Sequence, residues 1–142
     1  MLTPGTLLYF NPFVFKNGAQ PKAKYFVVLG HMDSDLIIAS LPTSKDHVPD
    51  DSQVLRGCVN IPERCVSAYV FEEGDTVTDN FSFPRRTFIY GEQVDEYREE
   101  DLINQMGGQM TELGCIKPNI FQDLIQCLKD SVVLRRKYRN WL

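Results

Sequence analysis

The sequence predicts an α+β fold that is mostly β, with a small antiparallel barrel followed by two C-terminal helices. Short apolar runs rich in β-branched and aromatic residues recur through residues 1–96, too closely spaced for crossover helices. From about residue 97 the apolar period changes to that of a helix. A chain of 142 residues holds one ordinary core. We therefore expect a single domain over residues 1–142, with residues 97–142 packed on a barrel of residues 1–96.

The first three predicted strands occupy residues 5–10, 25–30 and 35–41. The first follows Pro4 and the second follows a basic loop, and both contain β-branched and aromatic residues. The third stops at Pro42, because proline supplies no hydrogen-bond donor to a β-ladder. Polar turn-forming residues follow, so the pattern predicts a loop over residues 45–52.

Two more strands are predicted at residues 65–71 and 86–94, and two helices follow them. The first helix has acids at residues 99–101 in its first turn and is stopped by glycines at 107–108. The second begins near Pro118 and carries basic residues at 135–137 near its end. Its apolar stripe, from Ile120 to Val132, is expected to pack the helix onto the sheet.

The formal net charge of −4 conceals an uneven distribution. Residues 1–45 carry +2, residues 46–114 carry −10, and residues 115–142 carry +4. Two interpretations remain open: a basic groove built from both ends of the chain that contacts phosphate, or solvated charges dispersed over separate faces.

The cysteines are Cys58, Cys65, Cys115 and Cys127, and their spacing matches no zinc motif. The first residues resemble no signal peptide, so we expect a cytoplasmic protein with reduced thiols. No apolar run approaches the roughly 20 residues that span a bilayer, so no membrane association is expected. Because glycine-rich dinucleotide and phosphate loops are missing from the sequence, we expect no cofactor, and because of the cysteine spacing we expect no metal.

Residues 1–45 carry a resemblance to a known family. A strand near the N-terminus, a basic loop leading into a Val/Leu strand, and a third strand ending in Pro42-Thr43-Ser44 resemble the PemK/MazF toxin family. The resemblance implies a small SH3-like barrel that cuts single-stranded RNA without a metal, forms a homodimer and is neutralised by an antitoxin protein. Family members use an Arg at the head of the second strand and a Ser or Thr at the end of the third. Thr43 and Ser44 match the latter, whereas Lys24 stands in place of the Arg and Tyr25 in place of the usual Pro.

On this resemblance, the candidate catalytic residues are Lys24, Thr43, Ser44 and His47. Lys24 would bind phosphate, Thr43 or Ser44 would position the reacting oxygen, and His47 would move a proton. The candidate substrate-binding residues are Lys22 and Lys45.

Each of these residues also has a simpler interpretation. Thr43 and Ser44 can form a turn after Pro42, and His47 can be a solvated loop residue. Lysine also lacks the planar fork with which arginine grips phosphate. A second hypothesis is therefore a non-catalytic SH3-like barrel that binds RNA, a peptide or another protein.

Overall fold

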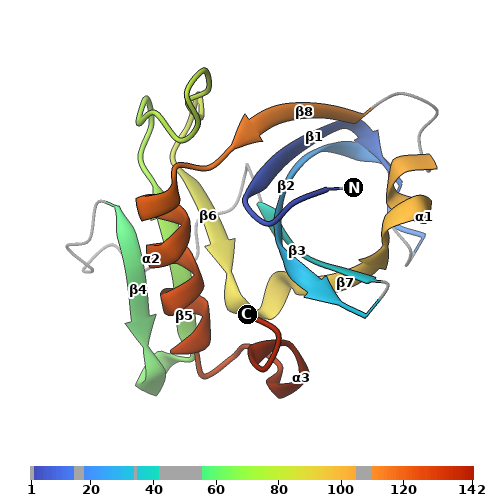
Figure 1. Ribbon diagram of the computed structural model, residues 1–142. Coiled ribbons are helices and arrows are strands. Elements are labelled where there is room, and N and C mark those ends of the chain that lie inside the picture. Colours follow the sequence, from blue (N-terminus) through green and yellow to red (C-terminus); the bar gives the residue numbers. More distant parts are fainter. Residues whose placement is uncertain (1, 15–17, 34, 42–55, 105–109) are drawn as a thin grey trace.

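The computed structural model describes residues 2–14, 18–33, 35–41, 56–104 and 110–142 (Figure 1). Over these residues it contains two antiparallel sheets and three α-helices. The predicted α+β, mostly β class is confirmed. Among the described strands, however, the sheets do not close into a barrel.

The larger sheet has five strands in the order β7-β3-β2-β1-β8. The first three predicted strands are confirmed as β1, β2 and β3, and they pair consecutively. Strand β8 was not predicted; it pairs with β1 and lies inside the segment expected to be helical. The bounds are β1 Thr6–Phe13, β2 Lys22–Met32, β3 Asp35–Leu41, β7 Val94–Arg98 and β8 Met110–Cys115.

This sheet is strongly curved, as Figure 1 shows. Register shifts interrupt its ladders between Phe10 and Phe13, and again between Val28 and Gly30. Such irregularities bend a strand and increase its twist. Side chains alternate between the faces, so the sheet buries apolar residues on both sides. One face holds Leu8, Phe10, Phe13, Phe26, Val28, Leu36 and Ile38, covered in part by Leu102 of α1 (Glu99–Asn104).

The smaller sheet, in the order β4-β5-β6, packs with α2 against the other face of the larger sheet. Its strands are β4 Gly57–Ile61, β5 Val66–Phe71 and β6 Thr87–Tyr90, with a 3₁₀ turn, η1 Pro62–Arg64, between the first two. Helix α2, Pro118–Lys129, lies alongside β4 and β5 (Figure 1). The predicted apolar stripe packs into the core through Leu124 and Leu128, whereas Val132, which was expected to continue it, lies beyond α2 and is 60% exposed.

A disulfide joins Cys58 of β4 to Cys127 of α2, with the two Cα atoms 5.5 Å apart. The expectation of four reduced thiols is therefore wrong for this pair. Cys65 and Cys115 are free and exposed. Sequence spacing did not indicate the bridge, because its cysteines are 69 positions apart and only the packing of α2 on β4 brings them together.

The predicted element boundaries after residue 85 need two corrections. The strand expected at 86–94 is β6, followed by a 3₁₀ turn, η2 Gly91–Gln93, and then by β7, which takes in Tyr97. The helix expected to reach residues 135–137 ends at Lys129, and a separate short helix, α3 Arg136–Arg139, follows the turn. The amides of Asp130 and Ser131 bond back to carbonyls of α2, so the chain turns there instead of extending the helix.

None of the described helices is long and apolar enough to cross a membrane.

The turn after β6 fits closely against the segment after α2, and Gly91 is the point of closest approach. A Cβ at this position would lie 2.5 Å from Ser131 Oγ and 3.1 Å from Val133 Cγ2. We expect Gly91→Ala to lower the free energy of unfolding by about 1–3 kcal/mol, because buried overpacking forces neighbours to shift. Urea denaturation measures the loss. Adding Ser131→Ala should recover part of it, and an unchanged midpoint for Gly91→Ala would contradict the contact.

Helix α3 is held on β7 by polar contacts. Lys137 Nζ donates to Glu96 Oε1 at 2.5 Å, and the buried Tyr138 donates its hydroxyl to the same oxygen at 3.3 Å. The hydrogen bond from Lys137 is the main cause that lowers the pKa of the Glu96 carboxyl below its ordinary value.

We expect Lys137→Met to raise the pKa of Glu96 toward its ordinary value. A depressed carboxyl pKa stabilises the fold above the unfolded-state pKa, and this contribution is lost as pH falls through the lower folded-state pKa. The substitution should therefore remove the contribution of the Glu96 carboxylate to the free energy of unfolding, a contribution that the native chain keeps down to more acidic pH. An NMR titration of the Glu96 carboxyl carbon measures the shift, and an unchanged pKa would show that Lys137 does not set it.

Candidate functional site

The structure describes two of the six predicted site residues, Lys22 and Lys24. Both belong to β2, where Lys22 is exposed and Lys24 is only 8% exposed. Lys24 pairs with Phe10 and, by strand alternation, shares its face with Phe26. The other predicted site residues, Thr43, Ser44, Lys45 and His47, lie outside the described residues.

The opposite face of β2 carries an aromatic pair that sequence reasoning missed. Tyr25 lies opposite Tyr9 of β1, and the two ring centroids are 4.8 Å apart with the planes tilted by 43°. Both rings are partly exposed. Each tyrosine lies in a predicted strand, but only the register of β1 against β2 places the rings side by side.

Two phenylalanine rings pack against Tyr25. Its centroid lies 5.7 Å from that of Phe81 and 5.2 Å from that of the buried Phe83. Burial, and secondarily Tyr9, raise the pKa of the Tyr25 phenol. The hydroxyl therefore stays protonated at neutral pH and can donate a hydrogen bond.

The two tyrosines form one wall of a shallow pocket of about 210 Å³, which we call the tyrosine pocket. The segment before β6 forms the other wall, where the Thr87 hydroxyl donates to the carbonyl of Arg85 at 2.8 Å and so holds that backbone. The pocket is lined by Tyr9, Ala23, Tyr25, Pro84, Arg85 and Thr87.

Arg85 is exposed at the edge of the tyrosine pocket, and its guanidinium pairs with no carboxylate among the described residues. Its neighbour Arg86 differs, since it lies 3.7 Å from Glu72 and over the ring of Phe88. The tyrosine pocket therefore combines two aromatic rings, a neutral phenol donor and a cation available to a ligand. None of the described residues that line it is a carboxylate.

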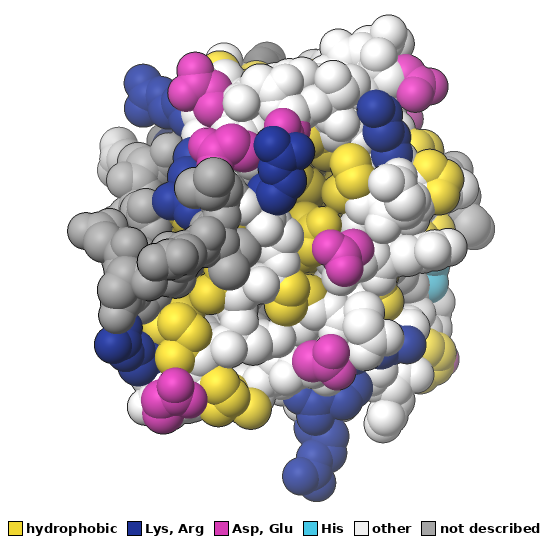
Figure 2. All heavy atoms as spheres, turned by 90° about the vertical axis from the view of Figure 1, so that its left-hand side faces the viewer, with side chains coloured by type: hydrophobic (Ala, Val, Ile, Leu, Met, Phe, Trp, Pro, Cys, Tyr) yellow, Lys and Arg dark blue, Asp and Glu magenta, His cyan; other side chains and the backbone are white. Residues whose placement is uncertain are grey.

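The face that carries α2 and β4 has a mixed surface. Figure 2 shows apolar side chains there between scattered charges of both signs. Within the part of the chain that the structure describes, no group of three His, Cys, Asp or Glu side chains is placed to hold a metal ion. Among the described residues that line the tyrosine pocket, there is no His, Asp, Glu or Cys.

No family model matches this chain, and no curated protein matches it. The resemblance to the PemK/MazF family stays a prediction from residues 1–45.

Proposed function

We propose that this protein binds single-stranded RNA, with bases held at the tyrosine pocket. The observation that carries the proposal is the Tyr9–Tyr25 ring pair, 4.8 Å between centroids, beside the guanidinium of Arg85, which pairs with no carboxylate in the described part of the chain. Proteins hold single-stranded RNA by stacking bases on aromatic side chains of a sheet surface and by placing cations against the phosphates.

Local charge favours RNA over a peptide. Proline-rich peptides also dock on aromatic grooves, and basic residues in them need acidic partners. None of the described residues that line the tyrosine pocket is a carboxylate, whereas Arg85 lines it and the exposed Lys22 begins the strand that carries Ala23 and Tyr25. An anionic backbone suits these cations. With a net charge of −4, the protein should bind a short stretch of RNA locally, and the binding should weaken as salt rises.

RNA cleavage of the PemK/MazF type is a further proposal that rests on the resemblance alone. Cleavage would use Lys24, Thr43, Ser44 and His47. The same resemblance implies that the protein forms a homodimer and binds an antitoxin protein. The deep burial of Lys24 on the face of Phe10 does not favour contact between its amine and a phosphate. The binding function is therefore the better supported of the two.

Substitution of Tyr9 tests the binding function. We expect Tyr9→Leu to weaken binding of a fluorescein-labelled unstructured RNA by about 5- to 100-fold, because one base loses its stacking partner. Arg85→Ala should reduce the salt dependence of binding by about one phosphate contact. Fluorescence anisotropy at several salt concentrations measures both effects.

Two matched variants serve as controls. Trp141→Leu removes an aromatic side chain that is 46% exposed on another surface, and Arg135→Ala removes an exposed arginine outside the tyrosine pocket. Neither should change RNA affinity. Equal losses in the controls, or saturable binding of a proline-rich peptide but not of RNA, would overturn the proposal.

Incubation of the protein with a long unstructured RNA in EDTA tests the cleavage proposal. Metal-independent cleavage that both Lys24→Ala and Thr43→Ala abolish would support a PemK/MazF-like nuclease. Binding without cleavage would leave the RNA-binding module, and cleavage that resists both substitutions would exclude the predicted catalytic residues.

A further inference from the structure

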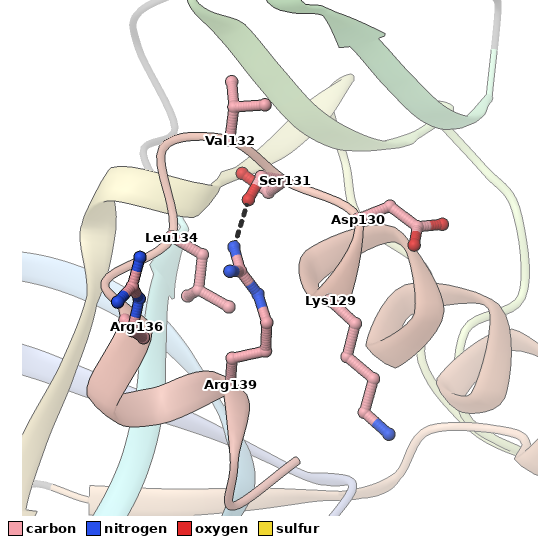
Figure 3. Close-up of a pocket in the computed structure, with 7 residues that line it drawn as sticks. All are labelled: Lys129, Asp130, Ser131, Val132, Leu134, Arg136 and Arg139. Carbon is pink, nitrogen blue, oxygen red and sulfur yellow. Dashed lines mark hydrogen bonds between the residues drawn. The ribbon is translucent and has the colours of Figure 1, made fainter.

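A second pocket lies at the junction of α2 and α3, on elements that do not contribute to the tyrosine pocket (Figure 3). Its volume is about 520 Å³, and we call it the basic pocket. Three of its side chains are cationic and one is acidic. It is lined by Lys129, Asp130, Ser131, Val132, Leu134, Arg136 and Arg139.

Arg139 occupies the middle of the basic pocket, with Arg136 to one side and Lys129 to the other (Figure 3). Its Nη2 donates to the Ser131 carbonyl at 2.6 Å, which holds the guanidinium in one orientation. Its Nε is shielded from solvent and has no hydrogen-bond acceptor among the described residues. A charge that is held still and partly dehydrated attracts an anion more strongly than a freely hydrated one.

Among the described residues, no carboxylate forms an ion pair with Lys129, Arg136 or Arg139. Asp130, the one acid among the described residues of the lining, accepts a hydrogen bond from Gln126 at 3.1 Å, and Figure 3 shows its carboxylate pointing away from Arg139. Lys137 provides the contrast within the same segment, because Glu96 neutralises it.

We propose that the basic pocket binds a phosphate group carrying two negative charges. An arginine fork held in place and two flanking cations match the charge and the several acceptor oxygens of such a group. The RNA-binding function does not depend on this site, because Tyr9, Tyr25 and Arg85 belong to other elements. The phosphate has two candidate sources: a free phosphate compound, or the 5′-phosphate of an RNA.

The test is an NMR titration of the full chain with pyrophosphate at constant ionic strength. We expect saturable shifts of the amides of residues 129–139. Lys129→Gln combined with Arg136→Gln should weaken the affinity by about tenfold or more, because two charge-assisted contacts are lost. Both side chains are exposed, so the fold should survive. Lys137→Gln, which removes a neutralised cation, should leave the affinity within about twofold.

Two outcomes would overturn the proposal. One is a shift that does not saturate, or that chloride reproduces at equal ionic strength. The other is an unchanged pyrophosphate affinity in the double variant together with lower thermal stability, since these cations would then only complement the C-terminal dipole of α2.

A second titration identifies the source of the phosphate. Tighter binding of a 5′-phosphorylated oligouridine than of its 5′-hydroxyl form, abolished by the double variant, would assign the site to an RNA end. Equal binding of the two oligomers, with pyrophosphate still bound, would assign it to a free phosphate compound. Tyr9→Leu should leave pyrophosphate binding unchanged, which separates failure of this site from failure of the tyrosine pocket.

Discussion

Removal of the Cys58–Cys127 disulfide is expected to lower the free energy of unfolding by about 4 kcal/mol. The bridge joins residues 69 positions apart, so in the unfolded chain it closes a long loop and restricts many conformations. Without it, strand β4 loses its covalent link to α2 and depends on pairing with β5 and on side-chain packing.

Urea denaturation followed by circular dichroism measures this loss. The experiment compares two chains that both carry Cys65→Ser and Cys115→Ser, which remove the exposed free thiols. One keeps the bridge, and the other also carries Cys58→Ala and Cys127→Ala. A reducing agent should reproduce the loss in the chain that retains the bridge and should not affect the chain that lacks it. Equal midpoints in all samples would contradict a stabilising disulfide.

Phe10→Ala is expected to cost about 3–5 kcal/mol of folding free energy, which is typical for truncation of a fully buried aromatic ring. Phe10 is inaccessible to solvent, and its ring centroid lies 5.1 Å from that of Phe13 and 5.5 Å from that of Phe26, both in edge-on geometry. The substitution would remove the ring that both neighbours contact and leave a cavity on that face of the sheet.

Chemical denaturation also measures this effect, with Ile103→Ala as the control because Ile103 is 42% exposed. The control should change stability by less than about 0.5 kcal/mol. Phe10→Leu should give an intermediate loss, since it keeps part of the volume. A loss for Phe10→Ala as small as that of the control would mean that the aromatic cluster does not hold the sheet together.

Strands β1, β2 and β3 were predictable from sequence because they are buried and dense in β-branched and aromatic residues. Strand β8 was not, because it is an edge strand with Thr111, Glu112 and Gly114 exposed, and so lacks apolar alternation. Its position depends on the ladder that β1 offers. That is a property of the tertiary structure and not of the six residues themselves.

The candidate site shows the same limit. Tyr9 and Tyr25 lie in predicted strands, but the tyrosine pocket also needs Arg85, which folds back from 60 positions further along the chain. The burial of Lys24 was within reach of the sequence. It alternates with Tyr25 and shares its parity with the buried Phe26 and Val28, so the period of two already placed it on a core face. The location of the disulfide, by contrast, depended on packing between distant elements.

The strand order has a consequence for how the chain folds during its synthesis. Strands β1, β2 and β3 pair with their sequence neighbours, but the larger sheet is completed only when β7 adds to β3 and β8 adds to β1. These late pairings give the larger sheet a high contact order and predict slow completion. Strand β3 can pair with β7 once residue 98 has left the ribosome, but the edge of β1 that pairs with β8 stays open until residue 115 has emerged. Such edges invite pairing with another chain, so a nascent chain truncated before β8 should aggregate more readily than the full-length protein.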